Sequence, residues 1–370
     1  MRIAILDNGT SDKASDRVEL VATLQSLGYE VSIGGIYSGT LNEYYTNNNI
    51  KFLALDASRN NTNPVVELLS IFKNAKILKN ETIENVIIYG IKNHPSMAVG
   101  AKIAGINNII CVVNGSGNLF RIEGIKGALL RTMAFPVLRI AYRGCKSICF
   151  QNTDDLKLFQ EKKLISKNTN TFITGGSGVN LEGFPFCDMP NENRFLFLSR
   201  ITASKGLLEF CKAARIVKKE YHDAIFDIVG PLDSTVENNS VHQELESAVN
   251  DNIVNYHGYT DDVPSWMKSC RYFVYPSFYP EGVPRCAIQA LATGRPIITC
   301  NSPGCKETVI DKYNGLLIEP RDVLGLAEGM RWLIEHKEEA EVMAINSRKY
   351  AEEKFDVNIV NEQVIGKMLE

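Results

Sequence analysis

Residues 275–307 read YPSFYPEGVPRCAIQALATGRPIITCNSPGCKE, and the pattern of this stretch predicts the fold of one domain. The β-branched and aromatic residues that end at Pro276 indicate a strand. A helix is expected from Pro284, because proline's fixed φ suits a first helical turn, to Gly294, which suits a left-handed cap. A second strand, 296–300, follows directly. The order strand, helix, strand is typical of a parallel α/β sheet.

Two polar side chains stand out in this stretch. Glu281 lies in the turn before the expected helix, and Gln289 lies inside a helix whose other residues are nearly all apolar. Such a helix is expected to be buried. Because a buried amide without a partner costs about 1–3 kcal/mol, Gln289 is predicted to meet a polar group, for which a backbone carbonyl or a water is the simplest choice.

Length and composition limit the classes of protein to consider. A chain of 370 residues favours two domains, and 45% hydrophobic with 22% charged residues is typical of a globular protein. A net charge of −3 argues against general nucleic-acid binding. Nine cysteines without a CxxC pair predict reduced, mostly buried thiols. The first ten residues read as a strand and not as a signal peptide, and no apolar run reaches the roughly 18 residues of a membrane span.

Strands and helices alternate along the whole chain, which predicts parallel sheets with helices on both faces. The Pro- and Asn-rich segment 183–194 is the expected linker between two domains, and 358–369 is expected to form a last helix. The strands are expected at 2–6, 29–33, 52–55, 86–89, 109–113, 147–150, 171–174, 195–198, 225–229, 253–257, 272–275, 297–300 and 315–318.

The segment 199–206, SRITASKG, follows an expected strand and opens a helix. Arg200 and Lys205 flank that helix N-terminus, where backbone N–H groups and the helix dipole already favour an anion. Two cations there predict a diphosphate site that needs no metal. The alternative is that both are ordinary surface cations.

The motifs PEGVPRCAIQALATGRPIIT, PGCKETV and NGLLIEP resemble the donor site of retaining glycosyltransferase family 4, and the Arg200–Lys205 spacing matches as well. The resemblance extends from about residue 86 to the end. It implies the GT-B fold: two Rossmann-like domains facing a central cleft, with a terminal helix returning to the first. The expected divisions are 1–187 for acceptor binding, 188–355 for nucleotide-sugar binding and 356–370 for the terminal helix. In such sheets, ligands lie outside the carboxyl ends of the strands.

The resemblance also implies roles for individual residues. Glu281 and His94 are the implied catalytic residues, and the acceptor side is implied for Asn114, Gly115 and Gly117. The family has a glutamate where this chain has Gln289, and that glutamate accepts hydrogen bonds from two ribose hydroxyls. A glutamine can accept a hydrogen bond at its oxygen, but its nitrogen can only donate. The residues implied to bind the donor are Arg200, Lys205, Glu281, Gly282, Val283, Gln289, Gly304 and Glu307.

The implied reaction moves a hexose or N-acetylhexosamine from a UDP-sugar to a polyprenyl-diphosphate-linked sugar. The UDP-sugar is a co-substrate; no cofactor or metal is expected, and the chain has no DxD triplet. Residues 126–146 combine five cations with apolar residues and no acid, which indicates either an ordinary surface helix or one that lies on an anionic membrane. The predicted location is cytoplasmic, peripheral on the inner face of the cell membrane.

Two other functions compete with transfer. The glutamine at 289 fits a nucleotide-sugar-binding relative without turnover. A glycoside hydrolase requires two opposed carboxylates, and Glu281 has no evident partner in the sequence.

Overall fold

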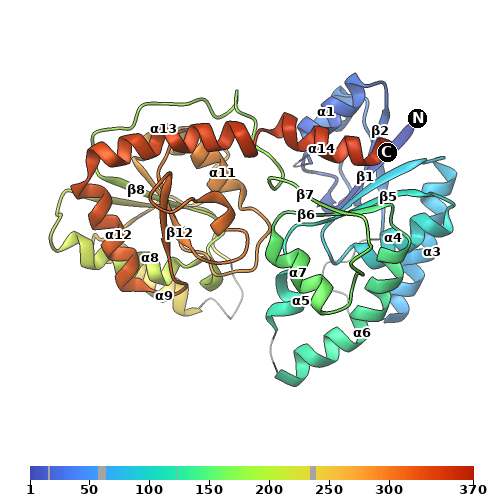
Figure 1. Ribbon diagram of the computed structural model, residues 1–370, viewed down its shortest axis with the longest axis horizontal. Coiled ribbons are helices and arrows are strands. Elements are labelled where there is room, and N and C mark those ends of the chain that lie inside the picture. Colours follow the sequence, from blue (N-terminus) through green and yellow to red (C-terminus); the bar gives the residue numbers. More distant parts are fainter. Residues whose placement is uncertain (16, 57–63, 123, 234–238) are drawn as a thin grey trace. The chain divides into compact units, whose positions relative to one another are not determined.

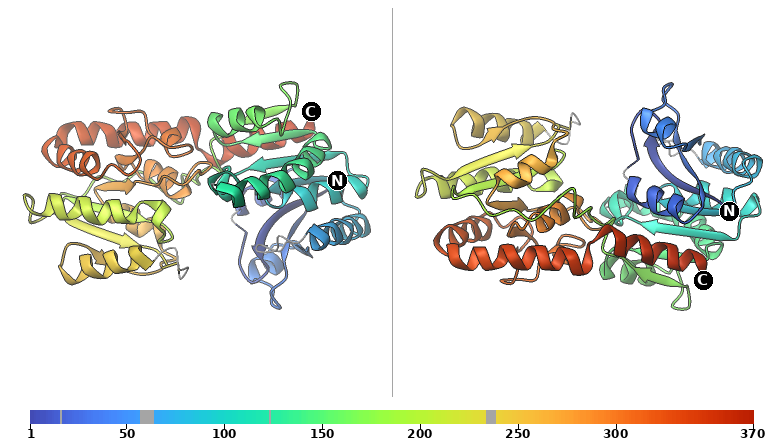
Figure 2. Two further views of the ribbon diagram at one scale, coloured as in Figure 1. Left: turned by 90° about the horizontal axis from the view of Figure 1, so that it is seen from below. Right: turned by 90° about the horizontal axis from the view of Figure 1, so that it is seen from above.

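The structure is a computed structural model that describes residues 1–15, 17–56, 64–122, 124–233 and 239–370. The chain forms two compact units (Figure 1). Unit 1 comprises Met1–Gly176 and Val357–Glu370, and unit 2 comprises Ser177–Asp356. Each unit has its own parallel sheet, and Figure 2 shows helices on both faces of each sheet.

Unit 1 contains a seven-stranded sheet in the order β3-β2-β1-β4-β5-β6-β7, in which every strand pair is parallel. The strands are β1 (Arg2–Thr10), β2 (Glu30–Ile36), β3 (Lys51–Ala54), β4 (Asn85–Tyr89), β5 (Asn108–Val113), β6 (Ser147–Phe150) and β7 (Thr171–Ile173). The helices that precede the crossing to unit 2 are α1 (Val18–Ser26), α2 (Glu43–Asn47), α3 (Pro64–Asn80), α4 (His94–Ile103), α5 (Gly117–Arg121), α6 (Gly124–Arg143) and α7 (Thr153–Glu161).

Side chains of the unit 1 strands alternate between two hydrophobic clusters, as the two-residue period of a strand requires. Ala4 and Leu6 enter the cluster on one face of the sheet, whereas Ile3 and Ile5 enter the cluster on the other. Because both faces are buried, these strands read as continuous apolar runs in the sequence.

The last helix, α14 (Val357–Leu369), belongs to unit 1 although it follows unit 2 in the sequence. Its Val364, Ile365 and Met368 complete the cluster that contains Ile3 and Ile5. The Asn108 amide and the Lys146 ammonium each donate to the Met368 carbonyl at 2.8 Å. This end of the chain is therefore an integral part of the first core.

Unit 2 contains a six-stranded parallel sheet in the order β10-β9-β8-β11-β12-β13. The segment after β12 contains a single 3-10 turn, Lys306–Thr308. The strands are β8 (Arg194–Leu198), β9 (Ile225–Val229), β10 (Asn255–Tyr256), β11 (Tyr272–Tyr275), β12 (Ile297–Cys300) and β13 (Gly315–Ile318). The helices are α8 (Leu207–Lys218), α9 (Asn239–Asn250), α10 (Val263–Ser269), α11 (Arg285–Ala292), α12 (Val323–Glu335) and α13 (Lys337–Lys354).

The units divide after Gly176, whereas the sequence placed the division after residue 187. The intervening segment runs along unit 2 and is held there by main-chain groups. The Val179 amide donates to the Phe355 carbonyl at 2.7 Å, and the Arg295 guanidinium donates to the Asp188 carbonyl at 3.3 Å. Irregular composition predicted a segment without helix or strand, but it could not indicate which unit holds that segment.

Candidate functional site

Three loops are joined at the carboxyl edge of the unit 2 sheet. They follow β8, β11 and β12, whose carboxyl ends lie at the same edge because the strands are parallel. The Phe278 amide donates to the Ser204 carbonyl at 3.0 Å, and the Ser302 hydroxyl donates to the Ser277 carbonyl at 2.8 Å. Side chains from distant parts of the sequence are thereby brought to one place.

Two glycines permit this close approach of the loops. Gly304 has φ +79°, and a Cβ atom there would lie 1.6 Å from the Gly282 carbonyl oxygen. Gly206 has φ +81°, and its Cβ would lie 2.2 Å from the Pro276 oxygen. Only glycine fits both the left-handed backbone and the space at these positions. The contribution of Gly282 and Gly304, both predicted to bind the donor, is thus at least partly to pack two loops together.

The carboxylate of Glu281 lies at the centre of these loops. Its Oε1 accepts from the Tyr275 hydroxyl at 2.6 Å and the Ser277 hydroxyl at 2.8 Å, and it lies 2.7 Å from the Lys205 Nζ. Two residues on which the sequence prediction relied, Lys205 and Glu281, are therefore an ion pair. Tyr275 and Ser277 were read only as strand and turn residues, although a hydroxyl at a strand's carboxyl end is a signal that could have identified them.

Lys205 retains capacity for a ligand within this cluster. Its side chain is 15% exposed and donates to the Tyr275 hydroxyl at 2.8 Å as well as facing Glu281. An ammonium has three donors, so one remains beyond these two partners. Burial and the neighbouring Glu281 carboxylate raise the pKa of Tyr275 well above its ordinary value. Tyr275 therefore stays protonated and can donate to Glu281.

Arg200 lies on the same loop but is held loosely. Its side chain is 67% exposed, and its Nε is 3.9 Å from the Asp233 carboxylate that follows β9. A second cation at this edge, Arg321, was not predicted; its guanidinium lies 4.6 Å from the centre of the Phe278 ring. Arg200 is therefore free to change its rotamer toward an anion at little cost.

Gln289 differs from its predicted environment. The helix α11 is buried at Ala287, Ile288 and 290–292, but Arg285 is exposed and Gln289 is half-buried. Among the residues that the structure describes, the Gln289 amide has no hydrogen-bond partner. The prediction that Gln289 is buried is wrong, because α11 has one accessible face on which Arg285 and Gln289 both lie.

The remaining predicted donor residues have structural partners. Val283 is buried in the hydrophobic cluster below α11. The Glu307 carboxylate lies 3.2 Å from the Lys354 Nζ, which also contacts the hydroxyl of Tyr350 on α13. Glu307 therefore has a cation partner at the end of α13.

In unit 1, His94 lies at the first position of α4 with no accessible surface. Its Nδ1 is 3.0 Å from the Tyr142 hydroxyl. Burial lowers the pKa of the ring to about 4, against the opposing effect of nearby backbone carbonyls, so the imidazole is neutral at pH 7. The proximity of His94 to the reacting centre stays a prediction, and in this structure the ring is not available to solvent.

The other predicted acceptor residues follow β5. Gly115 (φ +101°) and Gly117 (φ +58°) turn the chain into α5, and the Asn114 Oδ1 is buried with no partner in the described part of the chain. A residue missed by the sequence prediction lies at the same edge: the Arg17 guanidinium is 4.2 Å from the centre of the Tyr89 ring. The carboxyl edge of this sheet thus also carries polar groups.

The described residues contain neither a metal-binding cluster nor a membrane-spanning helix. No group of three or more His, Cys, Asp or Glu side chains among them is arranged to hold a metal ion. Within the same residues, no helix has the length and apolar character that crossing a bilayer requires.

Residues 189–350 match the family described as Glycosyl transferases group 1, a range that falls within unit 2 and includes all three loops. The matches support a glycosyltransferase whose second unit carries the group 1 region. The glycosyltransferase is 26% identical over 330 residues to the Campylobacter jejuni N,N'-diacetylbacillosaminyl-diphospho-undecaprenol alpha-1,3-N-acetylgalactosaminyltransferase, covering 85% of each chain. It is also 26% identical over 306 residues to the Escherichia coli UDP-Gal:alpha-D-GlcNAc-diphosphoundecaprenol alpha-1,3-galactosyltransferase, covering 77% of this chain and 75% of that one.

Solved structures show the fold of the glycosyltransferase. Anabaena Alr3699/HepE in complex with UDP aligns with a TM-score of 0.79 at 16% identity, over 100% of this chain and 99% of that one. Sucrose-phosphate synthase from Thermosynechococcus elongatus aligns with a TM-score of 0.76 at 17% identity, over 99% and 97%. The predicted α/β GT-B fold and the predicted enzyme class are both confirmed.

Proposed function

We propose that this glycosyltransferase moves a hexose or N-acetylhexosamine from a UDP-sugar to a polyprenyl-diphosphate-linked sugar, with retention of configuration and without a metal. The observation that carries the proposal is the Lys205–Glu281 pair at the meeting point of three loops. The activities for which the Campylobacter and Escherichia relatives are named support the lipid-linked acceptor, and the name of the Escherichia relative supports a UDP-sugar.

In this proposal, Arg200 and Lys205 stabilise the leaving diphosphate. Both lie between β8 and the N-terminus of α8, where backbone amides add positive potential. Lys205 offers its remaining donor, and exposed Arg200 turns toward the phosphates. Two cations and a helix terminus supply the charge neutralisation that a metal ion provides in other transferases.

Glu281 is proposed to hold the sugar. Three donors converge on its Oε1, which fixes the carboxylate in one orientation. A fixed carboxylate beside the sugar lowers the energy of an oxocarbenium-like transition state, and the benefit is larger in a partly buried site than in water. The unpaired Gln289 amide is proposed to contact the nucleotide ribose, with its oxygen accepting from one hydroxyl and its nitrogen donating to the other.

Unit 1 is proposed to bind the acceptor through the loop that contains Asn114, Gly115 and Gly117. The buried Asn114 oxygen can accept from a sugar hydroxyl if its loop shifts. His94 is proposed to position the loop that follows β4, since its ring is enclosed beside Tyr142. This role predicts an effect on acceptor affinity more than on donor affinity.

The helix α6 is proposed to lie on an anionic membrane surface, which places the enzyme at the bilayer where its acceptor resides. Its buried residues, Gly127, Leu138, Ala141 and Tyr142, share one face. The opposite face carries four exposed apolar side chains at helical spacing, with cations beside them. These apolar residues are Ile125, Leu129, Met133 and Ile140.

The test is release of UDP from a panel of UDP-sugars, with a polyprenyl-diphosphate-linked sugar as acceptor. Lys205→Ala is expected to lower kcat about 10²- to 10³-fold and Arg200→Ala about tenfold, because each removes charge stabilisation from the leaving group. The control is Lys212→Ala, which removes an exposed cation from the middle of α8. Unchanged turnover in both loop variants would show that the diphosphate assignment is wrong.

A second function, nucleotide-sugar binding without turnover, is favoured by Gln289 alone. It predicts tight UDP binding with no transfer or hydrolysis for any donor. Gln289→Glu separates the two functions. Transfer that is present in the wild type identifies an enzyme, whereas transfer that appears only in the glutamate variant identifies a silent binder.

A further inference from the structure

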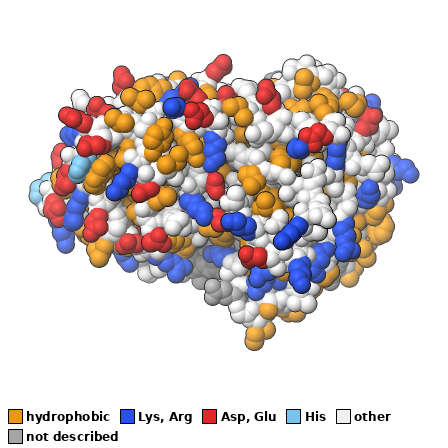
Figure 3. Space-filling model, in the orientation of Figure 1, with side chains coloured by type: hydrophobic (Ala, Val, Ile, Leu, Met, Phe, Trp, Pro, Cys, Tyr) orange, Lys and Arg blue, Asp and Glu red, His pale blue; other side chains and the backbone are white. Residues whose placement is uncertain are grey.

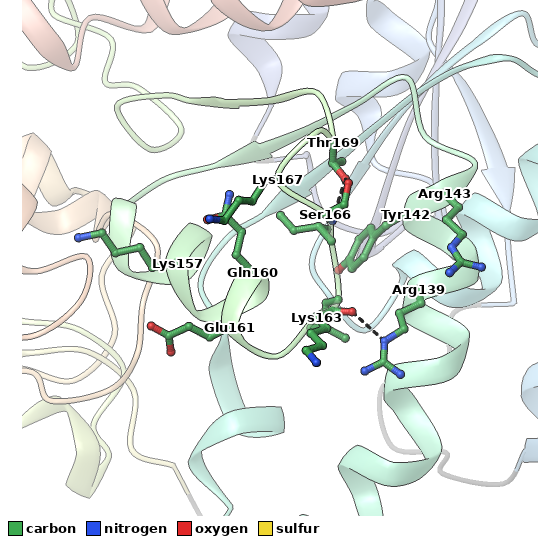
Figure 4. Close-up of a pocket in the computed structure, with 12 residues that line it drawn as sticks. Arg139, Tyr142, Arg143, Lys157, Gln160, Glu161, Lys163, Ser166, Lys167 and Thr169 are labelled. Atoms are coloured by element: carbon green, nitrogen blue, oxygen red, sulfur yellow. Dashed lines mark hydrogen bonds between the residues drawn. The ribbon is translucent and has the colours of Figure 1, made fainter.

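Unit 1 contains a cationic pocket of about 620 Å³ between the end of α6, the end of α7 and the loop before β7 (Figure 4). Pockets of this size accommodate small organic ligands. The Arg139 guanidinium donates to the Lys163 carbonyl at 2.8 Å and to the Lys162 carbonyl at 3.3 Å, which ties the loop to α6. The pocket is therefore a defined structural feature that two contacts hold in shape.

The pocket lies at the edge of the sheet opposite the predicted acceptor loop. α6 ends just before β6 begins, and 163–169 leads directly into β7, so the lining comes from the amino edge. Asn114 and His94 follow β5 and β4 and lie at the carboxyl edge. The residues to which acceptor or catalytic roles are assigned do not line the pocket, although the hydroxyl of the lining residue Tyr142 lies 3.0 Å from His94 Nδ1.

The charge of the lining is strongly positive. Five of the lining side chains are cationic and one is acidic, and among the described residues none of the five cations has a carboxylate within ion-pair distance. Like charges at close range repel one another, and an anion in their midst relieves that repulsion. The cations are Arg139, Arg143, Lys157, Lys163 and Lys167, and the acid is Glu161.

The pocket adjoins the apolar face of α6. Ile140, the last exposed apolar residue of that face, lies between Arg139 and Arg143 in the same helical turns. Figure 3 shows Lys and Arg side chains gathered over the part of unit 1 where α6 and α7 lie. A ligand that presents an anionic group beside an apolar phase would satisfy both features at once.

We infer that this pocket binds the phosphate of an anionic phospholipid headgroup while the apolar face of α6 enters the lipid layer. The inference rests on the proposed membrane contact of α6 and adds to it a specific headgroup site. A phosphate held by several cations is fixed more firmly than by general attraction to a charged surface. The pocket therefore supplies orientation as well as affinity.

The experiment measures binding of dihexanoyl phosphatidylglycerol, below its micelle concentration, to the full chain by calorimetry. The pocket variant is Lys163→Gln with Lys167→Gln, since both side chains are exposed and Lys163 keeps the carbonyl that Arg139 uses. The matched control is Lys76→Gln with Lys79→Gln on α3, which makes the same change of charge at exposed positions of the same unit. We expect saturable 1:1 binding, weakened at least tenfold in the pocket variant and less than twofold in the control.

Three results would overturn the inference: no saturable binding, equal weakening in the two variants, or inorganic diphosphate binding as tightly as the lipid. The last result identifies a site for a soluble anion. Flotation with phosphatidylcholine vesicles that contain phosphatidylglycerol should follow the same order of variants. Transfer to a short-chain, water-soluble acceptor is measured in parallel. Absence of lipid binding in the wild type, with transfer retained, refutes this inference alone, whereas absence of transfer in the wild type refutes the proposed function.

Discussion

The Lys205 ammonium and the Glu281 carboxylate lie 2.7 Å apart, and the Tyr275 hydroxyl is hydrogen-bonded to both. The two groups proposed to act on opposite ends of the donor therefore neutralise each other when no donor is bound. In the proposed complex, the donor diphosphate lies beside Lys205, which then shares its charge between two anions. The pair is thus a preorganised site whose orientation is fixed before the substrate arrives.

Glu281→Gln removes the negative charge while retaining an oxygen that can accept from Tyr275 and Ser277. We expect kcat to fall about 10²- to 10³-fold, because a neutral amide does not stabilise a developing positive charge. The measurement is sugar transfer followed by product detection, with thermal unfolding as a check on the fold. If kcat is retained while the affinity for the donor falls, Glu281 contributes only to binding.

Tyr275→Phe removes the hydroxyl that links the ion pair. We expect kcat to fall about tenfold, because a hydrogen bond to a charged group contributes about 1.5–3 kcal/mol and part of that orients Glu281. The matched control is Tyr272→Phe on the same strand, whose buried hydroxyl donates to the Leu333 carbonyl at 2.7 Å. The control should lose stability with kcat unchanged; equal losses of kcat in both variants would contradict a specific role for Tyr275.

Gly304→Ala tests the close contact between two loops. Its Cβ would lie 1.6 Å from the Gly282 oxygen on a left-handed backbone, so we expect the free energy of unfolding to fall by more than about 3 kcal/mol. Gly258→Ala is the control, because Gly258 has φ +70° and nothing within 4 Å of the added atom. It should cost only about 1 kcal/mol. Denaturant unfolding measures both, and similar values would mean that the loops separate easily.

The buried His94 makes the free energy of unfolding depend on pH. Burial lowers the pKa of its folded state from 6.5 to about 4, so the unfolded chain binds the proton first as the pH falls. Stability from the neutral ring is complete above pH 6.5 and is lost between pH 6.5 and 4, by about 3 kcal/mol in total. The measurement is the free energy of unfolding of the wild type and of His94→Gln at several pH values between 6.5 and 4. The slope should be shallower in the variant, and equal slopes would show that His94 titrates normally.

Much of the fold could be predicted from the sequence, because apolar runs such as those around Ile3 and Phe273 mark buried parallel strands. Motif spacing identified Arg200 and Glu281 as candidates for the two sides of the proposed donor site. It did not predict the contact between Lys205 and Glu281, because the spacing of residues within one loop says nothing about the distance between two loops. The burial of Gln289 was predicted wrongly, because composition indicates only the average burial of a helix. Packing buries some faces of α11 and leaves another face accessible.

The two compact units divide after Gly176 and not near residue 187, for a related reason. Pro and Asn mark a segment without regular structure, but its partners, Phe355 and Arg295, lie far along the chain. Such pairings depend on tertiary contacts that local composition does not encode.

The position of α14 has a consequence for biosynthesis. Its Val364, Ile365 and Met368 cover strand residues that are translated before unit 2, whereas α14 itself is translated after unit 2. The nascent first sheet therefore leaves the ribosome with one apolar area uncovered, and it keeps that area until the second unit has been synthesised. Unit 2 can complete its core during translation, whereas unit 1 completes its core only after α14 has been translated.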